Sequence, residues 1–377
     1  MRTFLLTCGF SWIVVLGTAQ KSLDQLSQAE LEKQAFEQLE SGKGDPSEAA
    51  LLILQKANNR PSKYVINANT ILGIVHKNRG HYISALEYYI TALDASEQLG
   101  DKGRISASLN NIGIMYVLQE NYSKAIYYFN RSLKLEEKLN QPLQKSIRLF
   151  NLGDCYKELE QYDEALGYYT NSLLIEKKEK NKLGIVYAEL GIADVYAHTN
   201  RLTDAKVTLN KVQELLPDAD LEAELLFYKL TGETAMAENR FAEAESSLKK
   251  AEQFSWKHDL KNQLLDIYQL LAQLYSTNNQ ANQAVVYYRK YIEMAEQLQN
   301  NFVKNQLEDL TYQNKLKRKQ LQIQYLKEQQ TLAEKNAKAM RELRKYDWKI
   351  MIFSVFALLA VITVVFIGVR RLVQFNK

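Results

Sequence analysis

Few residues in this sequence have the types and spacing that metal binding or phosphate binding needs. The four histidines are His76, His81, His198 and His258, and no two stand at the i, i+4 spacing that places two imidazoles on one helix face. The glycine-containing stretch GKGDPS at 42–47 lacks the spacing of a phosphate-binding loop. We therefore expect no metal site and no cofactor.

Cys155 is the remaining candidate nucleophile. Cys8 lies in the apolar N-terminal segment, so Cys155 would be the sole cysteine of a processed chain and could form no internal disulfide. A buried structural thiol is the better interpretation, because no partner for catalysis is evident. The sequence also lacks a nucleophile elbow, a kinase signature and a paired-carboxylate motif. These observations predict a protein that is not an enzyme.

A small residue followed by a pair of large residues returns along the chain. The copies are ALEYY at 85–89, AIYYF at 125–129, ALGYY at 165–169 and AVVYY at 284–288. An aromatic ligand box, a set of modification sites and core packing could each explain them. Core packing is favoured, because two further copies carry leucine, Leu209 and Leu248, where only bulk is needed.

These copies belong to a longer repeat. Its alanines are separated by 40, 40, 40, 39 and 40 residues and are Ala85, Ala125, Ala165, Ala205, Ala244 and Ala284. Twelve residues before each stands another small residue: Gly73, Gly113, Gly153, Ala193, Gly232 and Ala272. Four residues after each alanine stands a large one: Tyr89, Phe129, Tyr169, Leu209, Leu248 and Tyr288. Small residues at two fixed positions let two antiparallel helices approach, and the large residue fills the gap beside them. Turn-forming stretches such as RGHYIS at 79–84 separate the two helices.

This pattern resembles the tetratricopeptide repeat, whose signature is a Leu-Gly pair, a Tyr three residues later, and then Ala, Phe or Tyr, and Ala. The resemblance covers residues 66–299 in six copies. The period is near 40 rather than the roughly 34 residues of the family, and its terminal proline is missing. Residues 20–65 are expected to hold a weakly matching helix pair that caps the array. The resemblance implies an all-α solenoid of about six to seven helical hairpins.

The resemblance also implies a groove, lined by the first helix of each hairpin, that holds a peptide or a partner helix. Its lining positions are Asn67, Lys77, Asn110, Asn111, Ile114, Asn151, Asp154, Lys157 and Asp194. Asn111 and Asn151 stand two places before the small residue, where asparagine in this family often bonds the backbone of a bound peptide. One amide can both donate and accept. The alternative is that these asparagines bond neighbouring repeats or water.

The N-terminal segment, residues 1–19, predicts an export signal. It has a basic start, a short apolar run and the small residues Gly17, Thr18 and Ala19 at its end. Cleavage is expected before Gln20, and an uncleaved anchor is the alternative.

Residues 350–369 predict a transmembrane helix. They include no charged residue, and at about 1.5 Å per residue they span roughly the 30 Å of the hydrocarbon layer. Trp348 precedes them at the interface and two arginines follow. With the export signal, this predicts a single-pass protein of the bacterial inner membrane. The repeats would lie in the periplasm and residues 370–377 in the cytoplasm.

Between repeats and membrane, residues 300–347 lack glycine and proline and predict one long helix, continuous with or close to the membrane helix. Its broken 3–4 pattern of apolar residues favours pairing with a second copy as a coiled coil, or packing back on the last repeat. Its basic clusters, at 315–319 and 341–345, are expected to be solvated, with lipid contact an alternative for the second. The net charge of +4 gives no strong nucleic-acid signal, and we expect no such partner.

The stretch QLGDKGRISASLNNIGIMYVLQENYSKAIYYFNRSLKLEEKL, at 98–139, resembles the exported sensor regions of bacterial membrane histidine kinases. In those proteins repeats, a coiled coil and one membrane helix precede a kinase or DNA-binding domain. The first three parts occur here in that order, and the fourth has no counterpart in this sequence. We expect a signalling input module that binds a polypeptide, with its output domain either on another chain or lost. The alternative is a structural scaffold for assembly of the cell envelope.

Overall fold

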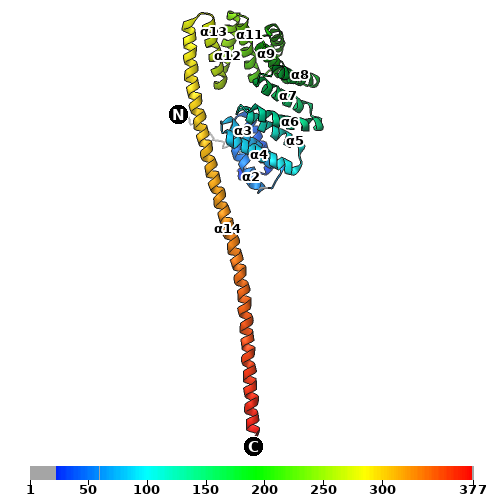
Figure 1. Cartoon of the computed structure of the whole chain (residues 1–377), viewed down its shortest axis with the longest axis vertical. Coiled ribbons are helices and arrows are strands. Elements are labelled where there is room, and N and C mark those ends of the chain that lie inside the picture. Colours follow the sequence, from blue (N-terminus) through cyan, green and yellow to red (C-terminus); the bar gives the residue numbers. More distant parts are fainter. Residues whose placement is uncertain (1–22, 59, 376–377) are drawn as a thin grey trace, which may run out of the picture. The chain divides into compact units, whose positions relative to one another are not determined.

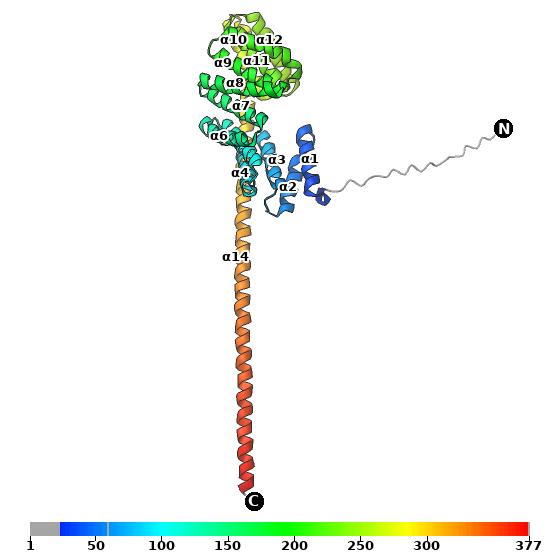
Figure 2. The same ribbon diagram turned by 90° about the vertical axis from the view of Figure 1, so that its right-hand side faces the viewer.

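A computed structural model describes residues 23–58 and 60–375, and it contains helices and turns but no strand within them (Figures 1 and 2). The predicted signal segment 1–19, with Cys8 and the cleavage position before Gln20, lies outside the described residues. The chain forms two compact units, Met1–Asp309 and Leu310–Lys377.

The first unit is an array of helical hairpins, as the sequence predicts. The described residues give seven successive pairs, the last of which uses only the start of a long helix. The pairs are α1 (Gln28–Ser41) with α2 (Pro46–Ala57), α3 (Lys63–Asn78) with α4 (Tyr82–Leu99), α5 (Lys102–Val117) with α6 (Tyr122–Leu139), α7 (Pro142–Glu158) with α8 (Tyr162–Glu179), α9 (Lys182–His198) with α10 (Leu202–Leu215), α11 (Leu221–Ala237) with α12 (Phe241–Lys257), and α13 (Lys261–Thr277) with α14 (Ala281–Phe375). Two short 3-10 helices, Leu23–Gln25 and Leu216–Asp218, complete the described secondary structure.

The four hairpins that carry a glycine at the small position are closed by the small-to-large contact that the repeat predicts. The ring of Phe129 lies so near Gly113 that an added Cβ would come within 2.5 Å of it. Gly73 and Gly153 face the rings of Tyr89 and Tyr169 in the same way, at 2.4 and 2.7 Å. Since real Cβ atoms do not approach so closely, these glycines are what allows the rings to be buried. The core-packing interpretation is confirmed for these copies.

The last copy differs from the prediction. Tyr288 was expected to fill the core, but it is 41% exposed, whereas the preceding Tyr287 is 6% exposed. The Tyr287 ring instead stacks on Tyr275 at 5.5 Å between centroids. In the copy at Tyr169 the ring is also covered by Gly191 of the following hairpin, whereas α14 continues as one helix and no further hairpin covers Tyr288 within the described residues.

The turn inside the hairpin is also repeated, in the six hairpins from α3–α4 to α13–α14. One residue per turn has a left-handed backbone with φ between 55° and 77°: Gly80, Glu120, Glu160, Asn200, Asn239 and Asn279. The next backbone N–H donates to the carbonyl five residues earlier, as from His81 to His76 at 2.8 Å. This is the Schellman end of a helix, and it reverses the chain within three residues.

The helix α14 includes the segment predicted to be one long helix, 300–347, and continues through residues 350–369. Within the first unit it touches the turn between α3 and α4, because the Asn305 side-chain amide donates to the Arg79 carbonyl at 2.9 Å. In the second unit, Trp348–Val365 is long and apolar enough to cross a membrane, and none of it is buried against the rest of the chain.

Candidate functional site

The predicted groove residues lie on the first helices of the hairpins, α3, α5, α7 and α9. These helices follow one another through the array, and α7 contacts α9 as α9 contacts α11 (Figure 2). A polar side chain on these helices can therefore bond either a neighbouring repeat or a bound partner.

Three of the asparagines bond neighbouring repeats. The Asn151 side-chain amide donates to the Asn110 side-chain oxygen at 2.8 Å, which joins α7 to α5. Asn67 donates to Glu32 of α1 at 2.6 Å. Because Asn110 is also buried, its carboxamide is part of the packing between repeats. The structure thus favours the alternative interpretation for these three residues.

Lys157, Asp194 and His198 form an ionic cluster between α7 and α9. The Lys157 ammonium lies 2.7 Å from one Asp194 oxygen, and His198 Nδ1 lies 3.0 Å from the other. Burial alone would raise the pKa of Asp194, but the His198 hydrogen bond and the Lys157 charge lower it to about 2. The hydrogen bond to Asp194 raises the pKa of His198 to about 9. The cluster fixes α7 against α9.

Asp154 is held by a neighbour within its own hairpin. The Tyr169 hydroxyl donates to the Asp154 carboxylate at 2.6 Å. Burial raises the pKa of Asp154 to about 6, although this hydrogen bond acts in the opposite direction. The ring that fills the core at Gly153 therefore also positions the adjacent carboxylate.

Two predicted groove residues have polar side chains without a bonding partner in the described part of the chain. Lys77 on α3 and Asn111 on α5 are half-buried, and neither side chain makes a hydrogen bond or ion pair within the described part of the chain. Ile114, also predicted to line the groove, packs partly against the core beside Phe129. Among the predicted groove residues, the polar groups most available to a partner are therefore Lys77 and Asn111.

Sequence reasoning missed a set of buried serines and glutamates between the hairpins. Ser106, Ser132 and Glu136 meet at the α5–α6 hairpin, with the Ser106 hydroxyl donating to Glu136. Arg148 of α7 completes this set: its Nε donates to Ser132 at 2.7 Å and its Nη2 lies 3.4 Å from Glu136. The period of 40 could have found them, because the same three residue types recur at Ser146, Ser172 and Glu176.

Cys155 is fully buried, and burial raises the pKa of its thiol to about 12, which suits a structural residue. The described residues include no group of three or more side chains placed to hold a metal ion.

Family models of the tetratricopeptide repeat match residues 64–138, 149–183 and 265–298. No curated protein matches the sequence.

Among solved structures, the apo form of RapI is similar with a TM-score of 0.61 and 14% identity, over 73% of this chain and 100% of that one. A Rap protein complexed with competence and sporulation factor follows, with a TM-score of 0.57 and 13% identity over 73% and 76% of the two chains. Aspartyl phosphate phosphatase F from Bacillus subtilis gives a TM-score of 0.52 and 13% identity, over 72% and 86%. These likenesses establish a shared fold.

Proposed function

The chain is a tetratricopeptide-repeat protein, and we propose that it binds an extended polypeptide along the first helices of its hairpins. The observation that carries this proposal is the side-chain amide of Asn111, which is half-buried and makes no hydrogen bond within the described residues. The nearby Asn110 and Asn151, in contrast, are hydrogen-bonded to each other. A half-buried amide without a partner gains from a ligand backbone that offers both a donor and an acceptor. A Rap protein of similar fold is complexed with competence and sporulation factor, which supports binding at such an array. That the chain is not an enzyme remains a prediction.

We propose that the protein is a signalling input module anchored in the bacterial inner membrane. In this proposal residues 1–19 direct export, the repeats lie in the periplasm, residues 350–369 cross the bilayer and residues 370–377 reach the cytoplasm. The apolar segment Trp348–Val365 supports the anchor. The helix α14 is continuous from Ala281 to Phe375, which supports coupling of the repeats to the membrane segment, because a helix can transmit a rotation or shift along its axis.

We also propose that two copies pair through residues 300–347. Large apolar side chains of the 3–4 pattern in this part of α14, including Leu326 and Met340, are more than half exposed in the single chain. Pairing would cover such side chains in a coiled-coil seam. Crosslinking of the full chain in membranes at low expression should then trap dimers, and a monomer alone would contradict the pairing.

To test the binding proposal, the full chain is crosslinked in membranes, and the polypeptides of the exported compartment that are recovered with it are identified. Wild type is compared with the Lys77→Ala, Asn111→Ala double variant. We expect recovery of the partner to fall about tenfold, since two lost polar contacts amount to roughly 1–2 kcal/mol. Tyr127→Ala serves as the matched control, because Tyr127 is an exposed side chain on a second helix, α6. An unchanged partner list for the double variant contradicts binding through these residues.

The signalling role is tested by shifting the phase of α14 between 300 and 347. Two inserted residues rotate the following helix by about 200°, whereas seven inserted residues restore its direction to within about 20°. We expect the two-residue insertion to change the output and the seven-residue insertion to preserve it. If both insertions leave the output unchanged, the membrane helix is only an anchor and the scaffold function is favoured.

A further inference from the structure

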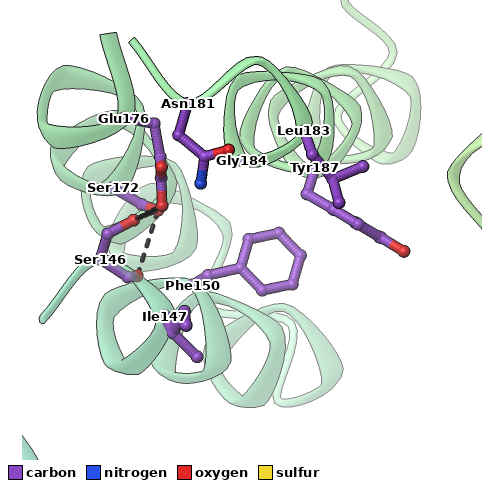
Figure 3. Close-up of a pocket in the computed structure, with 9 residues that line it drawn as sticks. All are labelled: Ser146, Ile147, Phe150, Ser172, Glu176, Asn181, Leu183, Gly184 and Tyr187. Carbon is purple, nitrogen blue, oxygen red and sulfur yellow. Dashed lines mark hydrogen bonds between the residues drawn. The ribbon is translucent and has the colours of Figure 1, made fainter. Parts of the chain in front are cut away.

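A cavity of about 310 Å³ opens between α7, α8 and α9 (Figure 3). One end is polar and is formed by Ser146, Ser172 and Glu176. Its walls are apolar and aromatic, with Ile147 and Phe150 from α7, and Leu183 and Tyr187 from α9. The cavity therefore presents a carboxylate at the end of an apolar passage.

The Glu176 carboxylate lacks a cation. Its side chain is 97% buried, because the residue retains only 3% of its exposure, and it accepts a hydrogen bond from Ser146. Its second oxygen, Oε2, has no hydrogen-bond partner within the described residues, and neither has Glu136 Oε2 one repeat earlier, so the two sites differ in the cation alone. No lysine, arginine or histidine of the described chain forms an ion pair with it. Burying a carboxylate without a neutralising cation costs free energy, so a ligand that supplies a cation would be stabilised here.

The chain itself shows which cation this set of side chains accepts. One repeat earlier, the equivalent residues Ser132 and Glu136 hold the guanidinium of Arg148, and all three are nearly fully buried. Forty residues after Arg148 the sequence has Ala188, so the second set keeps its serines and glutamate but loses the arginine. The two sites differ in whether the cation is supplied by the chain.

Gly184 of α9 also lines the second site, next to Glu176. A Cβ at this position would come within 2.3 Å of the Glu176 carboxyl group, so glycine is required beside it. The corresponding residue one repeat earlier is Gln144. The backbone of α9 at Gly184 therefore packs directly against the buried Glu176 carboxyl group, and the rest of the cavity lies beside that contact.

We propose that this cavity binds the side chain of an arginine in the polypeptide partner. The inference rests on the proposed function, since it adds a side-chain pocket to the polypeptide-binding face. The planar guanidinium would donate to Glu176 and Ser172 as Arg148 does to Glu136 and Ser132. The methylene groups would pack between Ile147 and Leu183, and the ring of Phe150 would border the cation.

The test uses the full chain in detergent and a displayed library of random hexapeptides. We expect wild type to enrich arginine-containing peptides, and replacement of that arginine by citrulline to weaken binding at least tenfold. Glu176→Gln removes the charge but keeps the size of the side chain and its hydrogen bond with Ser146. It should abolish the arginine preference. Glu179→Gln is the matched control, because it removes one charge from an exposed position on the same helix and should leave the preference intact.

A second variant, Ala188→Arg, restores the internal guanidinium and should also abolish the preference. If it fails to fold, Glu176→Gln still decides the question. Peptides enriched without an arginine preference, or with one that Glu176→Gln retains, overturn the inference and leave the proposed function intact. If no peptide is enriched and only N-acetylarginine amide binds in a Glu176-dependent way, both the assignment to a polypeptide and the proposed function fail.

Discussion

Gly113 and Gly167 are both helical glycines, but only Gly113 is packed. An added Cβ at Gly113 would lie 2.5 Å from the Phe129 ring, whereas at Gly167 it would meet no atom within 4 Å. We predict that Gly113→Ala lowers the free energy of unfolding by about 1–3 kcal/mol, because overpacking exceeds the gain in helix propensity. Gly167→Ala should raise it by about 1 kcal/mol. Thermal unfolding followed by circular dichroism measures both, and a similar rise for the two variants would contradict the packing account.

His198 should make stability depend on pH. Its folded pKa of about 9 lies above the ordinary value of 6.5, so its contribution is complete below pH 6.5 and is lost as pH rises through 9. We predict that wild type loses more stability between pH 6.5 and 9 than His198→Gln does. The measurement is the unfolding midpoint across this range. Parallel profiles for the two proteins would exclude the ion pair with Asp194 as a source of stability.

The asparagines show where prediction from the sequence stops at the residue scale. Asn110, Asn111 and Asn151 have the same side chain and were all placed correctly on first helices. Whether each bonds a neighbour depends on the approach of α5 to α7, which brings Asn151 within 2.8 Å of Asn110. The spacing of residues along one helix does not determine that approach, so the sequence alone could not separate Asn111 from the other two.

At the scale of elements, the turns inside the hairpins offer a test of backbone strain. Gly80 occupies the left-handed position of the first turn, whereas Glu160 occupies it in the third with φ of 58°. A residue with a side chain is strained there by roughly 1–2 kcal/mol. We predict that Glu160→Gly raises the free energy of unfolding by about 0.5–1 kcal/mol, since greater freedom of the unfolded chain offsets part of the relief. A lower unfolding midpoint for Glu160→Gly would contradict this explanation.

Helix and turn positions could be predicted because they depend on local sequence that the repeat copies six times. The left-handed turn residues recur at the same separations as the alanines. The prediction failed at Tyr288, which is exposed on α14, where no further hairpin follows in the described residues. The cavity at Glu176 was missed for a different reason. It depends on the loss of one arginine at Ala188, which appears only when buried residues of successive repeats are compared.

At the scale of the whole molecule, the sequence predicted the solenoid and the apolar helix. It also predicted a binding face, but most of the residues assigned to that face hold the repeats together. This division has a physical basis, since repeat arrays gain their stability from contacts between neighbours. Only side chains that make no contact between repeats can bind a partner without lowering the free energy of unfolding.

The central claim is that a polypeptide lies along the first helices, at Asn111. The most direct measurement places a photo-crosslinking amino acid at position 111 in the full chain, in membranes, and identifies the products after illumination. The same amino acid at Tyr127, an exposed residue of α6, is the control. We predict a discrete polypeptide adduct from position 111 that is absent from position 127. No adduct from position 111, or equal adducts from both positions, would contradict the claim.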